Sequence, residues 1–169
     1  MLPLVVYIFL CVQLLVVAYI DFKFRKISNH WILINFVFFC LLTWVFPDLY
    51  VWSLKTMIIP LAFLLVGFAL FALNIMGGGD SKYLSSFYLL IPVGFQDSVF
   101  LYLLYTTIII GSSLLLFNLL KNFDMILLFV GTKNISGIKK IFGKKFTYAP
   151  VIFVAWVWFG WQNFSYLKF

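Results

Sequence analysis

Two aspartates stand out in a chain that has few acidic residues. Its 169 residues include five acidic side chains, and all five are aspartates. Asp21 follows the apolar run Leu2–Ile20, and Asp80 follows the apolar run Met57–Met76 and three glycines. If both runs cross a membrane in the same direction, the two carboxyl groups lie at the same depth. Carboxylates that share a site repel each other, which raises the pKa of one and favours a pair that holds a single proton.

Such a pair suits acid–base chemistry on a carbonyl group. The ionised carboxylate can take a proton from water as that water attacks the carbonyl carbon, while the protonated carboxyl polarises the carbonyl oxygen. This is the chemistry of aspartic proteases. A low-dielectric setting at a membrane strengthens the effect because it disfavours a second charge. We expect only turn, solvated or local pairing roles for the other three acidic residues, which are Asp48, Asp97 and Asp124.

A glycine run directly precedes Asp80. Glycine has no side chain to keep an extended peptide away from a neighbouring carboxylate, and it tolerates unusual main-chain dihedrals. Gly77 and Gly79 are therefore candidate active-site residues. A flexible loop between two spans is the alternative, but it does not explain the aspartate. The segment Gly77–Lys82 reads GGGDSK, which does not match the phosphate-binding loop of nucleotide-binding proteins.

Composition indicates a membrane protein. Hydrophobic residues make up 65% of the chain and charged residues 10%, with a mean hydropathy of +1.13, whereas a soluble domain carries roughly 25% charged residues. We predict an all-α fold, a single transmembrane domain over residues 1–169 that is a polytopic bundle of six helices. Uncharged runs of suitable length place these spans at Leu2–Ile20, Trp31–Phe46, Met57–Met76, Tyr83–Phe95, Ser98–Leu120 and Tyr148–Phe164.

The basic residues predict how the chain lies in the membrane. With six spans, one side holds only Lys55 and Lys168, while the other holds ten basic residues. The positive-inside rule then places both termini outside and the two aspartates at the cytoplasmic face of the inner membrane. The run Tyr83–Phe95 is short, but without its crossing the charge bias would collapse. The ten residues are Lys23, Arg25, Lys26, Lys82, Lys121, Lys133, Lys139, Lys140, Lys144 and Lys145.

The net charge of +7 needs no nucleic-acid partner, because basic residues on a cytoplasmic rim also meet anionic lipid headgroups. The longest stretch outside the predicted spans covers residues 121–147. We predict that this segment is cytoplasmic, and its role stays open between lipid contact, substrate docking and a lid.

Two segments together resemble the type IV prepilin peptidases. They are Asp21–Asn29, which reads DFKFRKISN, and Gly77–Lys82, which carries a Gly-x-Gly-Asp motif. The compact chain is similar to the peptidases of tight-adherence (Flp) pili and to preflagellin peptidases. Ser28 stands where the family has proline, and serine can still cap the following helix. The resemblance implies Asp21 and Asp80 as catalytic residues, with active-site support from Arg25, Lys26, Asn29, Gly77, Gly79 and Lys82.

The resemblance also implies a function: removal of the leader from prepilin-like precursors, which carry a leader followed by a hydrophobic helix. No cofactor is implied. The cysteine-rich insert of the larger members that also N-methylate the product is absent, so we do not expect that activity. The alternative is a non-enzymatic transport or secretion component that uses the two aspartates for proton or ion transfer. A carrier would place them near the bilayer midplane, so their expected position at one face favours the peptidase.

The sequence shows no metal-binding spacing around its single histidine, His30, or its two cysteines, Cys11 and Cys40. We therefore expect leader cleavage to continue at a rate within about twofold of the untreated enzyme after chelation, because zinc sites need a cluster of such ligands. The measurement is a cleavage assay on purified protein with and without EDTA. Complete inhibition that added zinc reverses would contradict the aspartate pair as the sole catalytic machinery.

Overall fold

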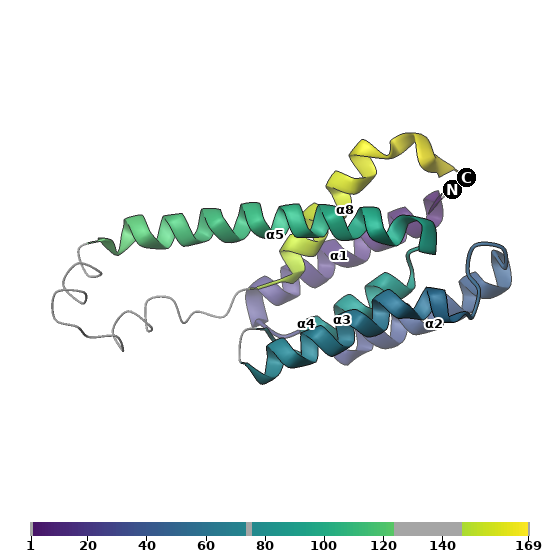
Figure 1. Cartoon of the computed structure of the whole chain (residues 1–169), viewed down its shortest axis with the longest axis horizontal. Helices are drawn as coiled ribbons and strands as arrows, with labels where there is room; N and C mark the ends of the chain where they lie inside the picture. The colour runs from purple at the N-terminus through teal and green to yellow at the C-terminus, as the bar shows by residue number, and fades with distance from the viewer. Residues whose placement is uncertain (1, 74–75, 124–146, 169) are drawn as a thin grey trace.

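The computed structural model describes residues 2–73, 76–123 and 147–168, and within these ranges the chain is helical. The predicted all-α fold is confirmed, apart from two-residue strands β1 (Leu2–Pro3) and β2 (Leu167–Lys168) that pair in parallel. Successive helices alternate in direction, and both chain ends lie at one end of the bundle (Figure 1). The six helices are α1 (Leu4–Phe24), α2 (Asn29–Val45), α3 (Leu54–Ala72), α4 (Gly78–Leu89), α5 (Val93–Lys121) and α8 (Ala149–Gln162), and a 3₁₀ turn, η1 (Phe164–Tyr166), follows.

Three of these helices, α1, α3 and α5, are long and apolar enough to cross a membrane. Their outer faces carry large apolar side chains, such as Leu65 on α3, which is 70% exposed. A bilayer can cover such faces, and water cannot do so favourably. The helices α2 and α8 are apolar but shorter. The chain is thus a membrane protein, while six crossings and the orientation of the termini stay predictions.

The predicted span Tyr83–Phe95 has the wrong boundaries. The structure has the helix α4 from Gly78 to Leu89, 12 residues long, which corresponds to about 18 Å. A bilayer core is about 30 Å thick, so α4 alone is too short to cross it. The helix ends ahead of Pro92, whose fixed φ and missing N–H favour a break there. A hydropathy pattern does not show the end of α4 because the run Tyr83–Phe95 remains apolar on both sides of it.

Gln96 and Asp97 were predicted to form a loop, but both lie within α5. The Gln96 side chain is 1% exposed, and its Nε2 donates to the carbonyl oxygens of Tyr88 (3.2 Å) and Ile91 (3.0 Å). The Tyr88 carbonyl lies in the last turn of α4 and also accepts the N–H of Ile91 at 3.2 Å. The Ile91 carbonyl lies just after the helix, where carbonyl groups lose their helical partners. Gln96 therefore caps α4 from the next helix. Asp97 is exposed, as expected for a solvated role. Asp124 lies outside the described residues, so its expected role stays a prediction.

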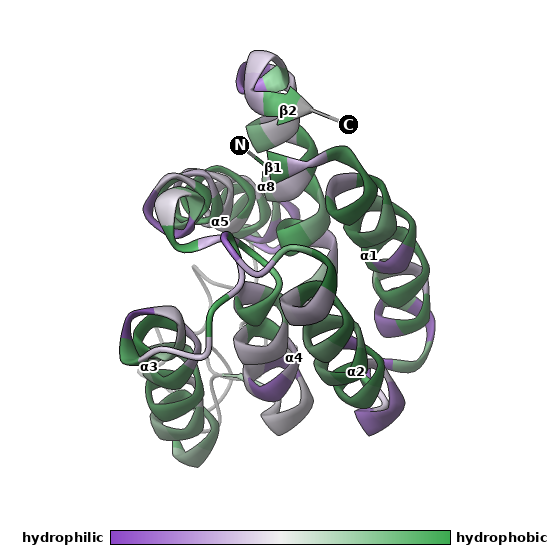
Figure 2. Cartoon of the chain, turned by 90° about the vertical axis from the view of Figure 1, so that its right-hand side faces the viewer, coloured by the Kyte–Doolittle hydropathy of each residue, from purple (hydrophilic) through white to green (hydrophobic). Residues whose placement is uncertain are grey.

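The helices form two groups that meet along α4. In one group α4 packs against α2 and α3, and in the other α8 packs against α1 and α5 (Figures 1 and 2). Trp156 of α8 joins the groups, because its ring contacts Phe87 of α4 and Tyr7 of α1 at centroid distances of 5.4 and 5.3 Å. Most side chains of α4 are buried because other helices enclose it, although its sequence, GGDSKYLSSFYL, contains several polar residues.

The glycine run begins α4, with Gly77 as the N-cap and Gly78 as the first helical residue. No described glycine has a positive φ, so the expectation that these glycines adopt unusual dihedrals is wrong. Close packing requires two of them instead. A Cβ on Gly79 would lie 3.1 Å from the carbonyl oxygen of Ile27, and one on Gly77 would lie 2.8 Å from Oδ2 of Asp80. A Cβ on Gly78 would make an ordinary contact with Phe71, at 3.4 Å.

Substitution of the three glycines should therefore have unequal effects on stability. Gly79→Val should lower the free energy of unfolding by about 1–3 kcal/mol, because it forces α4 away from the loop that contains Ile27. Gly78→Ala should stay within about 1 kcal/mol of the wild type, since alanine favours the helix. Thermal unfolding in detergent measures both, and equal transition temperatures for the two variants would contradict the close approach.

Candidate active site

Asp21 lies on the buried face of α1, within the helix rather than after it. Leu14 and Val17 are buried on the same face, and their spacing of three and four residues continues to Asp21, which is 3% exposed. Its Oδ2 accepts the main-chain N–H of Ala149 at 3.2 Å, and the main-chain N–H of Tyr148 also bonds to this carboxylate. These N–H groups begin α8, where a helix has free donors and a positive dipole end. The N-terminus of α8 thus binds the Asp21 carboxylate in the way that helix N-termini bind anions.

Asp80 lies at the beginning of another helix. It is the third residue of α4 and is 8% exposed. Its Oδ2 accepts the main-chain N–H of Gly77 at 3.1 Å, which is the position from which an acidic side chain caps a helix. Asp80 therefore has a structural role in starting α4. The same contact holds its carboxylate at the end of the bundle where Asp21 lies.

Tyr148 connects the two aspartates. Its main chain contacts the Asp21 carboxylate, and its side chain lies within electrostatic reach of Asp80. The Tyr148 hydroxyl is also 3.2 Å from Oγ1 of Thr107 on α5. A second connection comes from Gly79, next to Asp80, which touches Ile27 in the connection after α1. The structure therefore places Asp21 and Asp80 at the same end of the bundle, with Tyr148 near each of them.

The other predicted support residues divide into two groups. Gly77 and Gly79 lie at the beginning of α4, beside Asp80. Arg25 has a left-handed φ of 51°, and its N–H donates to the carbonyl oxygen of Asp21 at 2.8 Å, which ends α1 one turn after the aspartate. The Arg25 side chain is exposed. The side chains of the remaining basic and polar candidates are exposed as well; these candidates are Lys26, Asn29 and Lys82. Ser28 caps α2 as expected, since its Oγ accepts the N–H of His30 at 3.3 Å.

Sequence reasoning assigned no role to Tyr148 or Ala149. The available signal was Pro150, because proline is favoured in the first turn of a helix, where its missing N–H has no cost. The residues just before it then supply free N–H groups. Nothing in the sequence, however, indicates that Asp21, which lies 128 residues before Ala149, would be the acceptor.

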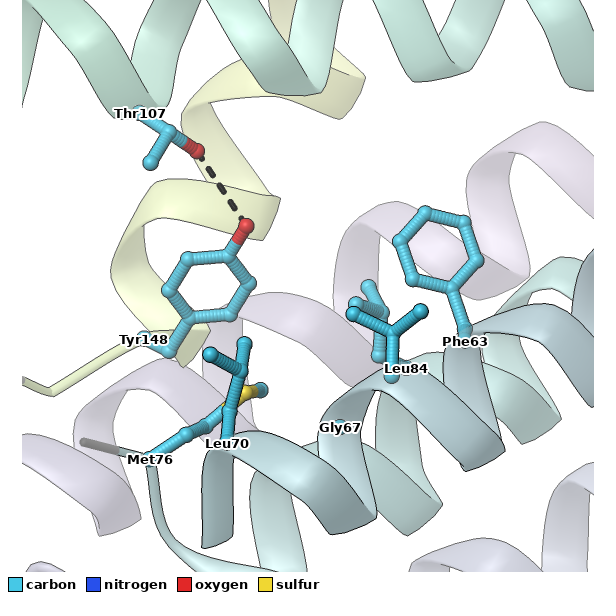
Figure 3. A pocket seen from close by; sticks show the side chains of 8 residues that line it. Phe63, Gly67, Leu70, Met76, Leu84, Thr107 and Tyr148 are labelled. Atoms are coloured by element: carbon cyan, nitrogen blue, oxygen red, sulfur yellow. Dashed lines mark hydrogen bonds between the residues drawn. The ribbon is translucent and has the colours of Figure 1, made fainter. Parts of the chain in front are cut away.

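A cavity of about 310 Å³ lies between α3, α4 and α5, and Tyr148 forms part of its lining. Figure 3 shows the Tyr148 ring on one side, with its hydroxyl directed toward Thr107, and Phe63 on another side. Apart from this hydroxyl pair, the lining side chains are apolar. They belong to Phe63, Val66, Leu70, Met76 and Leu84, with Gly67 between them. The arrangement offers an apolar compartment next to Tyr148, and neither aspartate is among the residues that line it.

Comparison with known proteins gives one match. The profile of the type IV leader peptidase family matches residues 8–121, a range that includes Asp21 and Asp80 but ends before Tyr148. No curated protein matches the chain. No solved structure matches it either. The family profile covers about two thirds of the sequence, and the two segments that resembled prepilin peptidases both lie within it. The chain therefore belongs to the type IV leader peptidase family.

Proposed function

We propose that this membrane protein is an aspartic-type endopeptidase that removes the leader of type IV prepilin-like precursors at the cytoplasmic face of the inner membrane. The observation that carries the proposal is the pair of buried carboxyl groups, Asp21 and Asp80, which share Tyr148 as a neighbour at one end of the bundle. Family membership supports a peptidase rather than a transport component. The positive-inside pattern supports the cytoplasmic face.

The chemistry follows from the two carboxyl groups. One is ionised and takes a proton from a water molecule, whose oxygen bonds to the carbonyl carbon of the scissile peptide; the other is protonated and donates to the carbonyl oxygen. The resulting tetrahedral intermediate breaks its C–N bond when a proton reaches the amide nitrogen. The products are a leader with a free carboxylate and a mature protein with a free amine. Asp21 and Asp80 divide these two roles between them.

The apolar cavity supports the type of substrate. A prepilin-like precursor continues from its leader into a hydrophobic helix, and the cavity offers an apolar compartment that is lined in part by Tyr148, the neighbour of both aspartates. In the proposed complex, the first apolar side chain after the cut bond enters between Leu70 of α3 and Tyr148. The remainder of the hydrophobic helix stays in the lipid beside α3, whose outer face is apolar.

Single substitutions of the aspartates test the mechanism. Asp21→Asn and Asp80→Asn should each lower the rate of leader removal by about 100-fold or more, because asparagine cannot exchange the proton that general acid–base catalysis requires. Asp48→Asn, at an exposed position, is the matched control and should keep the wild-type rate. The measurement is the mobility shift of a co-expressed prepilin, normalised to the amount of folded enzyme. Processing at close to the wild-type rate by either site variant would refute the paired mechanism.

Filling the cavity tests the proposed substrate contact. Leu70→Trp should lower kcat/KM about tenfold for a substrate with phenylalanine after the cut bond and much less for one with alanine, because apolar pockets discriminate by size to roughly this extent. Leu65→Trp, on the exposed face of the same helix, should leave both values unchanged. An equal loss for both substrates in Leu70→Trp would show that the cavity does not receive this side chain.

A further inference from the structure

Four buried polar side chains connect α1, α2 and α4 through a continuous set of hydrogen bonds. Gln13 Nε2 donates to Asn35 Oδ1 at 2.6 Å, and Asn35 Nδ2 donates to Ser86 Oγ at 3.0 Å. Ser86 Oγ donates to the carbonyl oxygen of Tyr83 at 2.8 Å, and the Tyr83 hydroxyl reaches Gln13 Oε1 at 3.4 Å. We call these four residues the Gln13–Asn35 network. Polar residues within membrane spans commonly bond across helices. Here Tyr83 joins the network at two points, through its main-chain carbonyl and through its hydroxyl.

The network lies close to both aspartates along their helices. Gln13 precedes Asp21 by eight residues on α1, which is about 12 Å. Tyr83 and Ser86 follow Asp80 by three and six residues on α4, which is about 4.5 and 9 Å. The network therefore joins the two helices that carry the candidate catalytic groups, within a few turns of both.

Asn35 is the central residue of the network, and it makes the two shortest bonds between helices. Helix α1 packs mainly against α8, and α4 packs against α2 and α3, so α1 and α4 belong to different groups of helices. Asn35 is 0% exposed and contacts both of them through its two amide atoms. An axial shift of α1 against α4 by one turn would separate these atoms by about 5.4 Å. Buried amides without partners are costly in an apolar medium, so only one register satisfies the network.

The geometry points to Gln13, Asn35, Tyr83 and Ser86 as positioning residues that fix the separation of Asp21 and Asp80. The catalytic part of this inference rests on the function proposed above. A network that serves only to hold helices together would affect stability alone. A positioning network also sets the distance between the ends of α1 and α4, and through that distance the rate of the chemical step.

Distance measurements test the positioning directly and do not depend on the substrate. Spin labels are placed at Phe22 on α1 and Lys82 on α4, which are both exposed, after replacement of Cys11 and Cys40. In Asn35→Leu we expect the distance distribution measured by double electron–electron resonance to shift or to become at least about twofold broader. Thr106→Val is the matched control, because it removes a buried hydroxyl that bonds to carbonyl groups of its own helix. Its distribution should equal that of the parent.

Kinetics on unlabelled variants provide the second measurement. Asn35→Leu should lower kcat for leader removal about 10-fold to 100-fold with KM changed less than about twofold, because a misplaced catalytic group costs rate rather than binding. Tyr83→Phe removes only the longest bond and should lower kcat less than about threefold. If Asn35→Leu does not fold, Ser86→Ala takes its place with the same expected direction.

Each outcome decides between the two interpretations. A wild-type distance distribution in Asn35→Leu, with or without a loss of rate, would overturn the positioning role. A changed distribution with a wild-type kcat would overturn its catalytic consequence. If the unmodified protein removes no leader at all, the proposed function fails, while the distance measurement still decides whether the network fixes the two helices.

Discussion

The structure depends most on how it accommodates a buried carboxylate. A carboxyl group in an apolar surrounding needs hydrogen-bond partners, since a buried polar group without one is costly. Asp21 finds them in the main chain at the beginning of α8, with Ala149 N–H at 3.2 Å. This requirement fixes where α8 begins relative to α1. At the other end of the bundle, β1 pairs with β2, so the first and last helices are aligned at both ends.

Asp80 shows how one side chain can serve both the fold and the candidate site. Its carboxylate caps the helix that carries it, which explains an acidic residue at this position without reference to catalysis. The glycines before it are also explained by packing, since Gly79 allows α4 to touch the loop of Ile27. The consequence is that both carboxyl groups are held by main-chain N–H groups at helix N-termini. Main-chain donors of this kind move little, which suits a site that must keep its geometry in a fluid membrane.

The sequence was sufficient for the all-α fold and for the family. Apolar runs located all six helices of the described residues, and the spacing from Val17 to Asp21 agrees with a shared buried face. Helix ends were predicted less well, because side-chain caps and proline determine them, as Gln96 and Pro92 do for α4. These features leave little trace in a hydropathy pattern. The part of the site that came from Tyr148 and Ala149 could not be predicted, since a contact over 128 residues has no local signal.

The contact between Asp21 and Ala149 also constrains the order in which the molecule can be completed. A ribosome delivers α1 to the membrane long before it has synthesised α8. Until then the main-chain donor that holds the Asp21 carboxylate does not exist, and neither does Tyr148. The contact between the first and last described helices therefore forms only after α8 has been synthesised.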